Sequence, residues 1–358
     1  MSVQITIEPL GQGVPSREGQ TVLDACLRAG VWLPHACGHG VCGTCKVQVL
    51  AGEYEHGDAS SFALMDFERD EGKILACCAI AATDLVIEAE VDEDPDARYL
   101  PLEDFEAVLA EARMLTPTIR GLWLRTERTV AFQPGQYLML QVPGAAGERE
   151  LERAISIANA PGEALIELHV RRVPQGRATG WLHDTLQPGQ TLRFTAPTGR
   201  FFARKSAALP MIFVAGGSGL SSPKSMILDL LQEGCSLPIT LIHGARNGGE
   251  LYYKELFEGL AERHANFSYV PVLSEPADGQ DGAWSGARGF AHEALKARFA
   301  NDFRGHKAYL CGPPLMTEAC IATLMQGRLF ERDIYTEKFF TAGDASAAAP
   351  RSPLFKAL

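Results

Sequence analysis

Four cysteines in the first quarter of the chain have the spacing of an iron–sulfur site. Cys37, Cys42 and Cys45 follow a C-x4-C-x2-C pattern, and a Cys77-Cys78 pair follows later. Four thiolates at this spacing hold the two irons of a plant-type [2Fe-2S] cluster. The glycines between the cysteines suit a tight loop with backbone N–H groups close to the sulfurs. The same thiolates could also bind zinc, and the spacing leaves Cys77 and Cys78 as alternative fourth ligands.

A second group of residues has the character of a phosphate site. Arg153 and Ser156 end one predicted strand, Arg171 ends another, and Gly176 and Thr179 lead into a predicted helix. Glycine and hydroxyl groups at a helix N-terminus favour an anion, because unpaired N–H groups and the helix dipole both attract negative charge. Arginine pairs and Gly-Thr turns are also common on strand edges, so ordinary solvated surface is the alternative.

Two glycine-containing turns follow buried strands in the C-terminal half. The first turn is formed by Gly216, Gly217, Ser218 and Gly219. It lies between a strand and a helix, where backbone can approach a pyrophosphate, but a mononucleotide site or a simple tight turn also fits, because the motif is not a strict G-x-G-x-x-G. The second turn is formed by Cys311, Gly312 and Pro313. It lies at the carboxyl edge of the predicted sheet, where open α/β folds bind ligands, although Cys311 could equally be a buried core residue.

Composition limits the partners and the location of the protein. The chain has 358 residues, of which 46% are apolar and 22% charged, as in folded proteins of two or three domains. Lys and Arg number 33 and Asp and Glu 44, a net charge of −11 that repels nucleic acid and anionic membranes. No apolar run is long enough to span a membrane and the first residues do not resemble a signal peptide, so we expect a cytoplasmic protein.

The sequence changes character along the chain, and three folded segments are predicted. Residues 1–93 contain short alternating strands and a helix that opens at Thr21, which predicts a small α+β unit, followed by an acidic linker at Asp92–Arg98. Residues 99–205 contain β-rich runs separated by Pro-Gly turns, which predicts an antiparallel barrel with Arg153–Ser156 at the end of its third strand. Residues 206–340 alternate strands with helices, which predicts a parallel sheet with crossover helices, and 341–358 form a tail.

Taken together, these motifs resemble the reductase components of bacterial multicomponent oxygenases, and among them those of phenol hydroxylases. The resemblance extends from Val3 to Phe340. It implies a β-grasp ferredoxin domain, an FAD-binding barrel and an NAD-binding α/β domain. It also implies Cys77 as the fourth cluster ligand, from the phrase Leu75-Ala-Cys77.

The family's site residues can be carried over to matching positions. Its flavin motif R-x-[YF]-S matches Arg153, Ile155 and Ser156, and the aliphatic Ile155 replaces the aromatic ring that usually packs on the flavin. The flavin-phosphate turn matches Gly176 and Thr179, with Arg171 nearby. The nucleotide site matches Gly216, Gly217, Ser218, Gly219, Arg246, Cys311, Gly312 and Pro313. Glu337 and Phe339 belong to a closing segment that approaches the flavin ring.

The resemblance implies electron transfer from NADH to FAD, to the [2Fe-2S] cluster and on to a di-iron oxygenase component that hydroxylates a phenol or related aromatic. Toluene or methane monooxygenase and a deoxysugar dehydratase are alternative acceptors, and a zinc-binding adaptor is the non-enzymatic alternative. A helix-terminal phosphate site also fits FMN. Glu250 near ribose hydroxyls would favour NADH, whereas Arg246 could accept the 2′-phosphate of NADPH.

Overall fold

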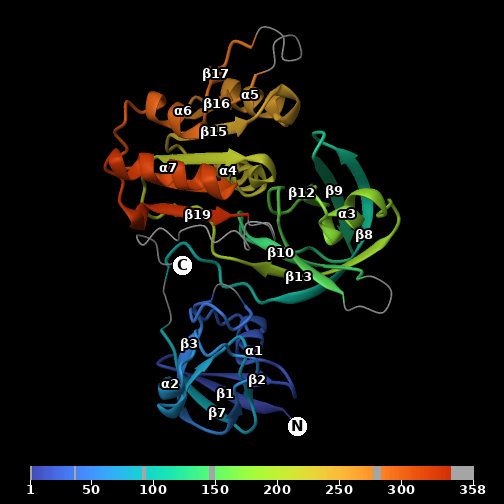
Figure 1. Ribbon diagram of the computed structural model, residues 1–358, viewed down its shortest axis with the longest axis vertical. Helices are drawn as coiled ribbons and strands as arrows, with labels where there is room; N and C mark the ends of the chain where they lie inside the picture. The colour runs from blue at the N-terminus through green and yellow to red at the C-terminus, as the bar shows by residue number, and fades with distance from the viewer. Residues whose placement is uncertain (1, 36–37, 91–93, 145–149, 277–283, 340–358) are drawn as a thin grey trace. The chain divides into compact units, whose positions relative to one another are not determined.

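The computed structural model describes residues 2–35, 38–90, 94–144, 150–276 and 284–339, and Figure 1 shows its elements. The chain folds as two compact units, the first extending to Glu103 and the second beginning at Asp104. None of the helices in the described part of the chain is long and apolar enough to cross a membrane. Cys37, Phe340, the predicted tail and residues 92–93 of the predicted linker lie outside the described residues.

The first unit is built on a mixed five-stranded sheet in the order β2-β1-β7-β3-β5. Its elements are β1 (Val3–Glu8), β2 (Gln12–Ser16), α1 (Val22–Arg28), β3 (Lys46–Ala51), β4 (Tyr54–Glu55), α2 (Asp66–Asp70), β5 (Lys73–Leu75), β6 (Ile80–Ala81) and β7 (Leu85–Glu88). Strands β1 and β7 run parallel at the centre, and β2, β3 and β5 pair antiparallel around them. This arrangement, with α1 packed into the core, confirms the predicted α+β unit of the β-grasp type.

Helix α1 begins as the sequence predicts. The hydroxyl of Thr21 accepts a hydrogen bond from the backbone N–H of Asp24 at 3.3 Å, which satisfies one orphan donor of the first turn. The Asp24 carboxylate pairs with Arg28, one turn later, at 3.0 Å. Cys26 lies on the buried face, where burial raises the pKa of its thiol to about 12. It is therefore a core residue and not a ligand.

The second unit opens with an antiparallel barrel. Its elements are β8 (Glu103–Met114), β9 (Ile119–Thr126), β10 (Tyr137–Val142), β11 (Leu151–Ser156), β12 (Ile166–Arg171), α3 (Arg177–Asp184) and β13 (Thr191–Thr198). The strand order is β11-β10-β13-β8-β9-β12, and an isolated bridge between Ile157 and Leu168 joins the two ends of the sheet. The predicted Pro-Gly turns are present, with φ of +99° at Gly135 and +92° at Gly189.

One element of the barrel was placed wrongly from the sequence. Arg153–Ser156 ends β11, the fourth strand of the barrel and not the third, because β8 precedes the strands that the sequence indicates. The sequence of β8 is rich in Glu and Ala, which favour helices, yet Phe105, Ala107 and Leu109 alternate inward into the barrel core. Tertiary burial of these three side chains outweighs the local preference.

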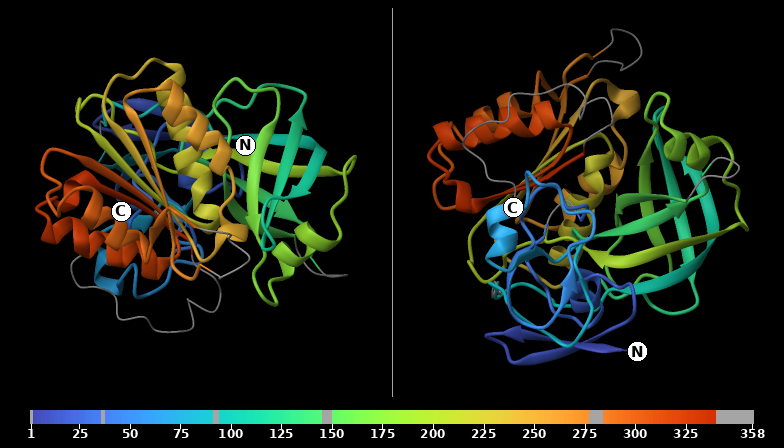
Figure 2. Two further views of the ribbon diagram at one scale, coloured as in Figure 1. Left: turned by 90° about the horizontal axis from the view of Figure 1, so that it is seen from above. Right: turned by 60° about the horizontal axis from the view of Figure 1, so that its bottom comes forward.

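The rest of the second unit is a parallel α/β sheet. Its elements are β14 (Met211–Gly216), η1 (Gly217–Leu220), α4 (Ser221–Gln232), β15 (Ile239–Ala245), η2 (Gly248–Glu250), α5 (Lys254–Arg263), β16 (Phe267–Leu273), β17 (Ala287–Arg288), α6 (Ala291–Arg298), β18 (Lys307–Gly312), α7 (Pro314–Gln326), η3 (Glu331–Asp333) and β19 (Ile334–Lys338). The order is β17-β16-β15-β14-β18-β19, and all neighbours pair in parallel. Helices cover both faces of the sheet, with α6 and α7 together on one side (Figure 2). The predicted parallel sheet is thus confirmed.

Candidate functional site

The loop that carries the predicted cluster cysteines has the backbone that a tight loop around a cluster requires. Gly38, Gly40 and Gly43 have φ of +73°, +75° and +75°, a region that other residues rarely adopt. A Cβ atom on Gly40 would lie 2.6 Å from Sγ of Cys78 and 3.0 Å from the carbonyl oxygen of Asp58. The loop is therefore packed too closely here to accept any side chain.

The structure describes three of the four predicted cluster ligands. Cys42 is exposed, whereas Cys45 and Cys77 are buried. A hydrogen bond from the Cys45 thiol lowers the pKa of Cys77 to about 6, helped by Cys78 and by the backbone N–H of Gly40 and opposed by burial. The Sγ atoms of Cys77 and Cys78 lie 3.6 Å apart.

These cysteines fit an iron–sulfur cluster in their chemistry. The same hydrogen bond with Cys77 raises the pKa of the Cys45 thiol, so one thiol of the pair donates to the other, and the thiolate is the form that binds a metal. In the described residues, which do not include Cys37, no three His, Cys, Asp or Glu side chains are gathered as a metal-binding group. The fit rests on the donor type, the glycine loop and the contact between Cys45 and Cys77.

In the second unit, one carboxyl oxygen draws together three side chains that are far apart in sequence. Oε2 of Glu337, on β19, lies 3.1 Å from the hydroxyl of Ser156 at the end of β11. It lies 2.7 Å from the hydroxyl of Ser222 in the first turn of α4, and 3.5 Å from Sγ of Cys311 at the end of β18. The barrel and the parallel sheet therefore meet at this carboxyl group.

The ionisation of this cluster is shifted toward the neutral forms. Burial raises the pKa of Glu337, although hydrogen bonds from the two serines and Cys311 partly oppose the shift. Burial and the Glu337 charge raise the pKa of Cys311 well above its usual value, and they raise the pKa of Tyr137 to about 12. The site thus holds hydrogen-bond donors around a carboxyl group that can itself gain a proton.

The family resemblance implied Ser156 and Glu337 near the flavin ring and Cys311 beside the nicotinamide, and the structure brings these three side chains together. Sequence reasoning missed Ser222, which completes the set. The available signal was the position of Ser222 directly after the glycine turn, in the first turn of the following helix. Phe339 is half-buried against the core of the sheet, and its backbone N–H donates to the carbonyl of Gly312 at 3.2 Å.

The two glycine turns lie against each other at the carboxyl ends of β14 and β18. A Cβ on Gly219 would lie 2.5 Å from the carbonyl oxygen of Cys311. Gly312 has φ of +146°, and a Cβ there would lie 2.8 Å from the carbonyl oxygen of Gly216. Pro313 caps α7 directly after this contact. Glycine is therefore required at these positions because the backbones of the two turns pack directly against each other, with the side chain of Met316 beside Gly216 and Gly312.

The residues of the predicted flavin-phosphate site lie at the ends of β11 and β12 and at the start of α3. The side chains of Arg153 and Arg171 are exposed, and Ile155 packs against the barrel core. Gly176 is the N-cap of α3. The Thr179 hydroxyl lies 3.4 Å from the Gly176 carbonyl oxygen and accepts from the N–H of residue 173 at 3.2 Å, so it also stabilises the turn itself.

Arg246 and Glu250 form an ion pair with a nitrogen–oxygen distance of 3.6 Å. The Glu250 carboxylate also accepts hydrogen bonds from the hydroxyls of Thr116 at 3.1 Å and Thr118 at 2.8 Å, both from the barrel. The side chain of Glu250 is 13% exposed and that of Arg246 56% exposed. Glu250 therefore faces the barrel threonines, a placement that sequence reasoning did not anticipate.

Three family models match successive parts of the chain. A 2Fe-2S iron-sulfur cluster binding domain matches residues 5–82. An oxidoreductase FAD-binding domain matches residues 106–202, and an oxidoreductase NAD-binding domain matches residues 213–321. These matches specify iron, FAD and NAD where the residues alone left zinc and FMN open.

Whole-length relatives have the same composition of domains. The chain is 56% identical to the reductase component DmpP of phenol 2-monooxygenase from a Pseudomonas species over 357 residues, which cover 99% of each chain. It is 54% identical to the phenol hydroxylase P5 protein of Acinetobacter pittii, again over 99% of each chain. Among solved structures, the reductase GcoB of Amycolatopsis superposes with a TM-score of 0.81 at 36% identity, covering 94% of this chain and 98% of that one.

Proposed function

The chain belongs to the reductase components of multicomponent oxygenases, which join a 2Fe-2S domain to FAD-binding and NAD-binding domains, and we propose that its acceptor is the di-iron oxygenase component of a phenol hydroxylase. When bound, the nicotinamide supplies an electron pair as a hydride and the cluster takes single electrons, so the flavin between them accepts pairs and releases single electrons. The protein's contribution is to hold these groups and to tune them.

The observation that carries the hydride-transfer assignment is the gathering of Ser156, Cys311 and Glu337. Ser156 comes from the FAD-binding barrel and the other two from the NAD-binding sheet. A flavin held by the first and a nicotinamide held by the second would therefore meet beside this carboxyl group. Because burial raises the pKa of Glu337, its carboxyl group takes up a proton more readily than an exposed carboxylate would and could donate or accept a hydrogen bond as the neighbouring ring changes charge.

The remaining predicted residues would hold the cofactors. Arg153 and Arg171 would pair with flavin phosphates beside the N-terminus of α3, since guanidinium groups match phosphate geometry. The paired glycine turns would admit the nucleotide pyrophosphate to the backbone. The thiolates of Cys37, Cys42, Cys45 and Cys77 would hold the cluster.

NADH is the proposed donor. The Glu250 carboxylate lies beside Arg246 and partly neutralises the cation that would otherwise attract a 2′-phosphate. A phosphate placed at Arg246 would also lie close to the Glu250 carboxylate, which would repel it. The pair therefore favours the unphosphorylated ribose of NADH.

Two further features support the proposed acceptor. Relatives that match over their whole length are named as phenol hydroxylase components. The net charge of −11 suits transient encounters with a partner that has a basic face, because charge steers such encounters. We place the protein in the cytoplasm, where NADH is available to it.

The test of this function is phenol-dependent NADH consumption. The purified protein is mixed with a phenol hydroxylase oxygenase component, and NADH oxidation and dihydroxylated product are measured with and without phenol. We expect product to form in proportion to NADH only when both proteins are present. Rapid NADH oxidation with ferricyanide but no phenol turnover would show that the electron-transfer reaction is right and the acceptor wrong.

A further inference from the structure

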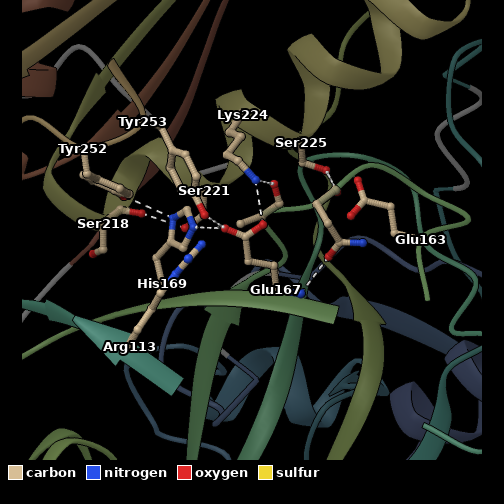
Figure 3. A network of polar contacts seen from close by, with 12 residues as sticks. Arg113, Glu163, Glu167, His169, Ser218, Ser221, Lys224, Ser225, Tyr252 and Tyr253 are labelled. Atoms are coloured by element: carbon tan, nitrogen blue, oxygen red, sulfur yellow. Dashed lines mark hydrogen bonds and ion pairs between the residues drawn. The ribbon is translucent and has the colours of Figure 1, made fainter. Parts of the chain in front are cut away.

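A buried polar network lies between the barrel and the NAD-binding sheet. Glu167 and His169 contribute from β12, Lys224 from α4, and Tyr252 and Tyr253 from the segment before α5 (Figure 3). Burying charged and polar groups is costly unless their hydrogen bonds are satisfied. Each polar group in this network therefore needs a hydrogen-bond partner, and the partners indicate which atoms donate and which accept.

Glu167 is the anion of the network. Its Oε2 accepts a 2.7 Å bond from Nζ of Lys224, and its Oε1 contacts Nε2 of His169 at 2.7 Å and the hydroxyl of Tyr253. Burial opposes its ionisation, but the hydrogen bonds and charges of His169 and Lys224 outweigh burial and lower its pKa to about 2. The Glu167 carboxylate is therefore ionised and can only accept hydrogen bonds.

The Glu167 carboxylate determines which nitrogen of His169 carries a proton. Nε2 of His169 lies 2.7 Å from the Glu167 carboxylate, and burial lowers the pKa of His169 despite that carboxylate, which favours the neutral ring with a single N–H. Because Nε2 faces an acceptor, the proton lies on Nε2, and Nδ1 presents a lone pair. That lone pair lies 3.1 Å from the hydroxyl of Tyr252.

The Tyr252 hydroxyl has two acceptors and one proton. Its oxygen lies 3.1 Å from Nδ1 of His169 and 3.1 Å from the carbonyl oxygen of Gly217. Burial raises the pKa of Tyr252 well above its usual value, so the hydroxyl keeps its proton. The histidine and the glycine carbonyl therefore compete for one hydrogen-bond donor.

Gly217 belongs to the glycine turn of the NAD-binding domain, and its peptide orientation matters for the nucleotide. In a trans peptide the carbonyl of one residue and the N–H of the next point in opposite directions. A hydrogen bond that holds the Gly217 carbonyl toward Tyr252 therefore turns the Ser218 N–H away from Tyr252. Gly217 has φ of +57° and opens the 3-10 turn η1, and the Tyr252 hydroxyl adds a side-chain hydrogen bond to its carbonyl.

We propose that Tyr252 is a positioning residue for the nicotinamide nucleotide: its hydroxyl holds the Gly217 carbonyl and so presents the Ser218 N–H to the pyrophosphate, while His169 competes for the same proton. This inference rests on the proposed function, since it assigns the glycine turn to NADH. Tyr252 acts through the backbone and touches no reacting atom.

Tyr253 provides the matched control. It belongs to the same network, but its hydroxyl donates to Glu167, whereas that of Tyr252 donates to Gly217. Removing its hydroxyl perturbs the interface between barrel and sheet without releasing the Gly217 carbonyl. A general interface effect would therefore appear in both tyrosine variants, and a positioning effect only in one.

The experiment measures the dissociation constant of NAD+ for the holoprotein by titration calorimetry. Tyr252→Phe should weaken binding by about three- to tenfold, the loss of one neutral hydrogen bond. Tyr253→Phe should stay within twofold of the wild type. Both should retain FAD, and the control Tyr253→Phe should also keep the wild-type maximal rate with ferricyanide at saturating NADH.

A third variant tests the competition. His169→Gln keeps an amide N–H for Glu167 but offers no acceptor at the position of Nδ1, so the Tyr252 proton passes to Gly217 and NAD+ should bind two- to fivefold more tightly. Equal weakening in the two tyrosine variants would overturn the role of Tyr252, and weaker binding in His169→Gln would overturn the competition. Failure of wild-type protein to bind NAD+ would instead contradict the proposed function.

Discussion

The ion pair between Lys224 and Glu167 should be one of the strongest supports of the second unit, and removing its cation tests this. Lys224→Met keeps the aliphatic length of the side chain and deletes the ammonium group. The side chains of Lys224 and Glu167 are only 5% and 7% exposed, so water cannot replace the missing partner. Glu167 would keep His169 and Tyr253 as partners but lose its only formal counter-charge in the network.

Breaking a buried ion pair by removing one partner typically costs about 3–5 kcal/mol, because the remaining charge is left buried without its counter-charge. The pKa of Glu167 is lowered from an ordinary 4.5 to about 2, with His169 contributing more than Lys224. Because the pKa is lowered on folding, this stabilisation is complete above about pH 4.5 and is lost as the pH falls toward 2. For the removal of Lys224 alone we therefore expect the lower end of the buried-pair range, about 3 kcal/mol.

The assay is thermal unfolding at pH 7, followed by the rise of FAD fluorescence as the second unit releases its flavin. A loss of about 3 kcal/mol corresponds to a melting temperature about 6–12 °C lower for a unit of this size. Lys254→Met is the surface control, because Lys254 pairs with Glu258 at 3.0 Å with side chains 37% and 46% exposed. It should change the melting temperature by less than about 2 °C. Equal melting temperatures for the two variants would refute the reasoning.

Three other predictions address the remaining sites. Glu337→Gln should slow flavin reduction by NADH, measured by stopped flow. The same variant should raise the melting temperature at pH 8, because burial raises the pKa of Glu337 and disfavours its anion. This gain in melting temperature should vanish as the pH falls to about 4.5, where the carboxyl group is protonated in the unfolded chain too. Gly219→Ala should reduce NADH-dependent ferricyanide reduction at least about tenfold, because its Cβ would lie 2.5 Å from the carbonyl oxygen of Cys311. Gly259→Ala in α5 is the control: its Cβ meets only the flexible end of Arg263, so this rate should not fall. Cys77→Ser should lose iron and visible absorption, and Cys78→Ser should retain both. Iron analysis and visible spectra of the purified variants measure this, and iron loss in both variants would contradict the assignment of Cys77 as the fourth ligand.

The sequence allowed the local parts of this structure to be predicted. The cysteine spacing, the Pro-Gly turns and the helix start at Thr21 each depend on a few neighbouring residues, and the structure confirms the turns and the helix start. The alternation of strands and helices after residue 206 likewise depends on local hydrophobic periodicity.

The parts that could not be predicted depend on contacts distant in sequence. Ser156 and Glu337 are 181 positions apart, and only the resemblance to a family suggested that they meet. The buried pair of Glu167 and Lys224 joins a strand and a helix at positions where the sequence has no motif. In a sequence, a buried Glu or Lys cannot be told from an exposed one, because these residues are mostly exposed. Glu250 faces barrel threonines that no spacing rule could connect to it.

The measurement that tests the central claim most directly is an anaerobic visible spectrum of the purified protein before and after one equivalent of NADH, repeated with NADPH. We expect a brown protein with flavin and thiolate-to-iron absorption that bleaches promptly with NADH and much more slowly with NADPH. A colourless protein, or one whose flavin and cluster absorption is unchanged by NADH, would contradict it.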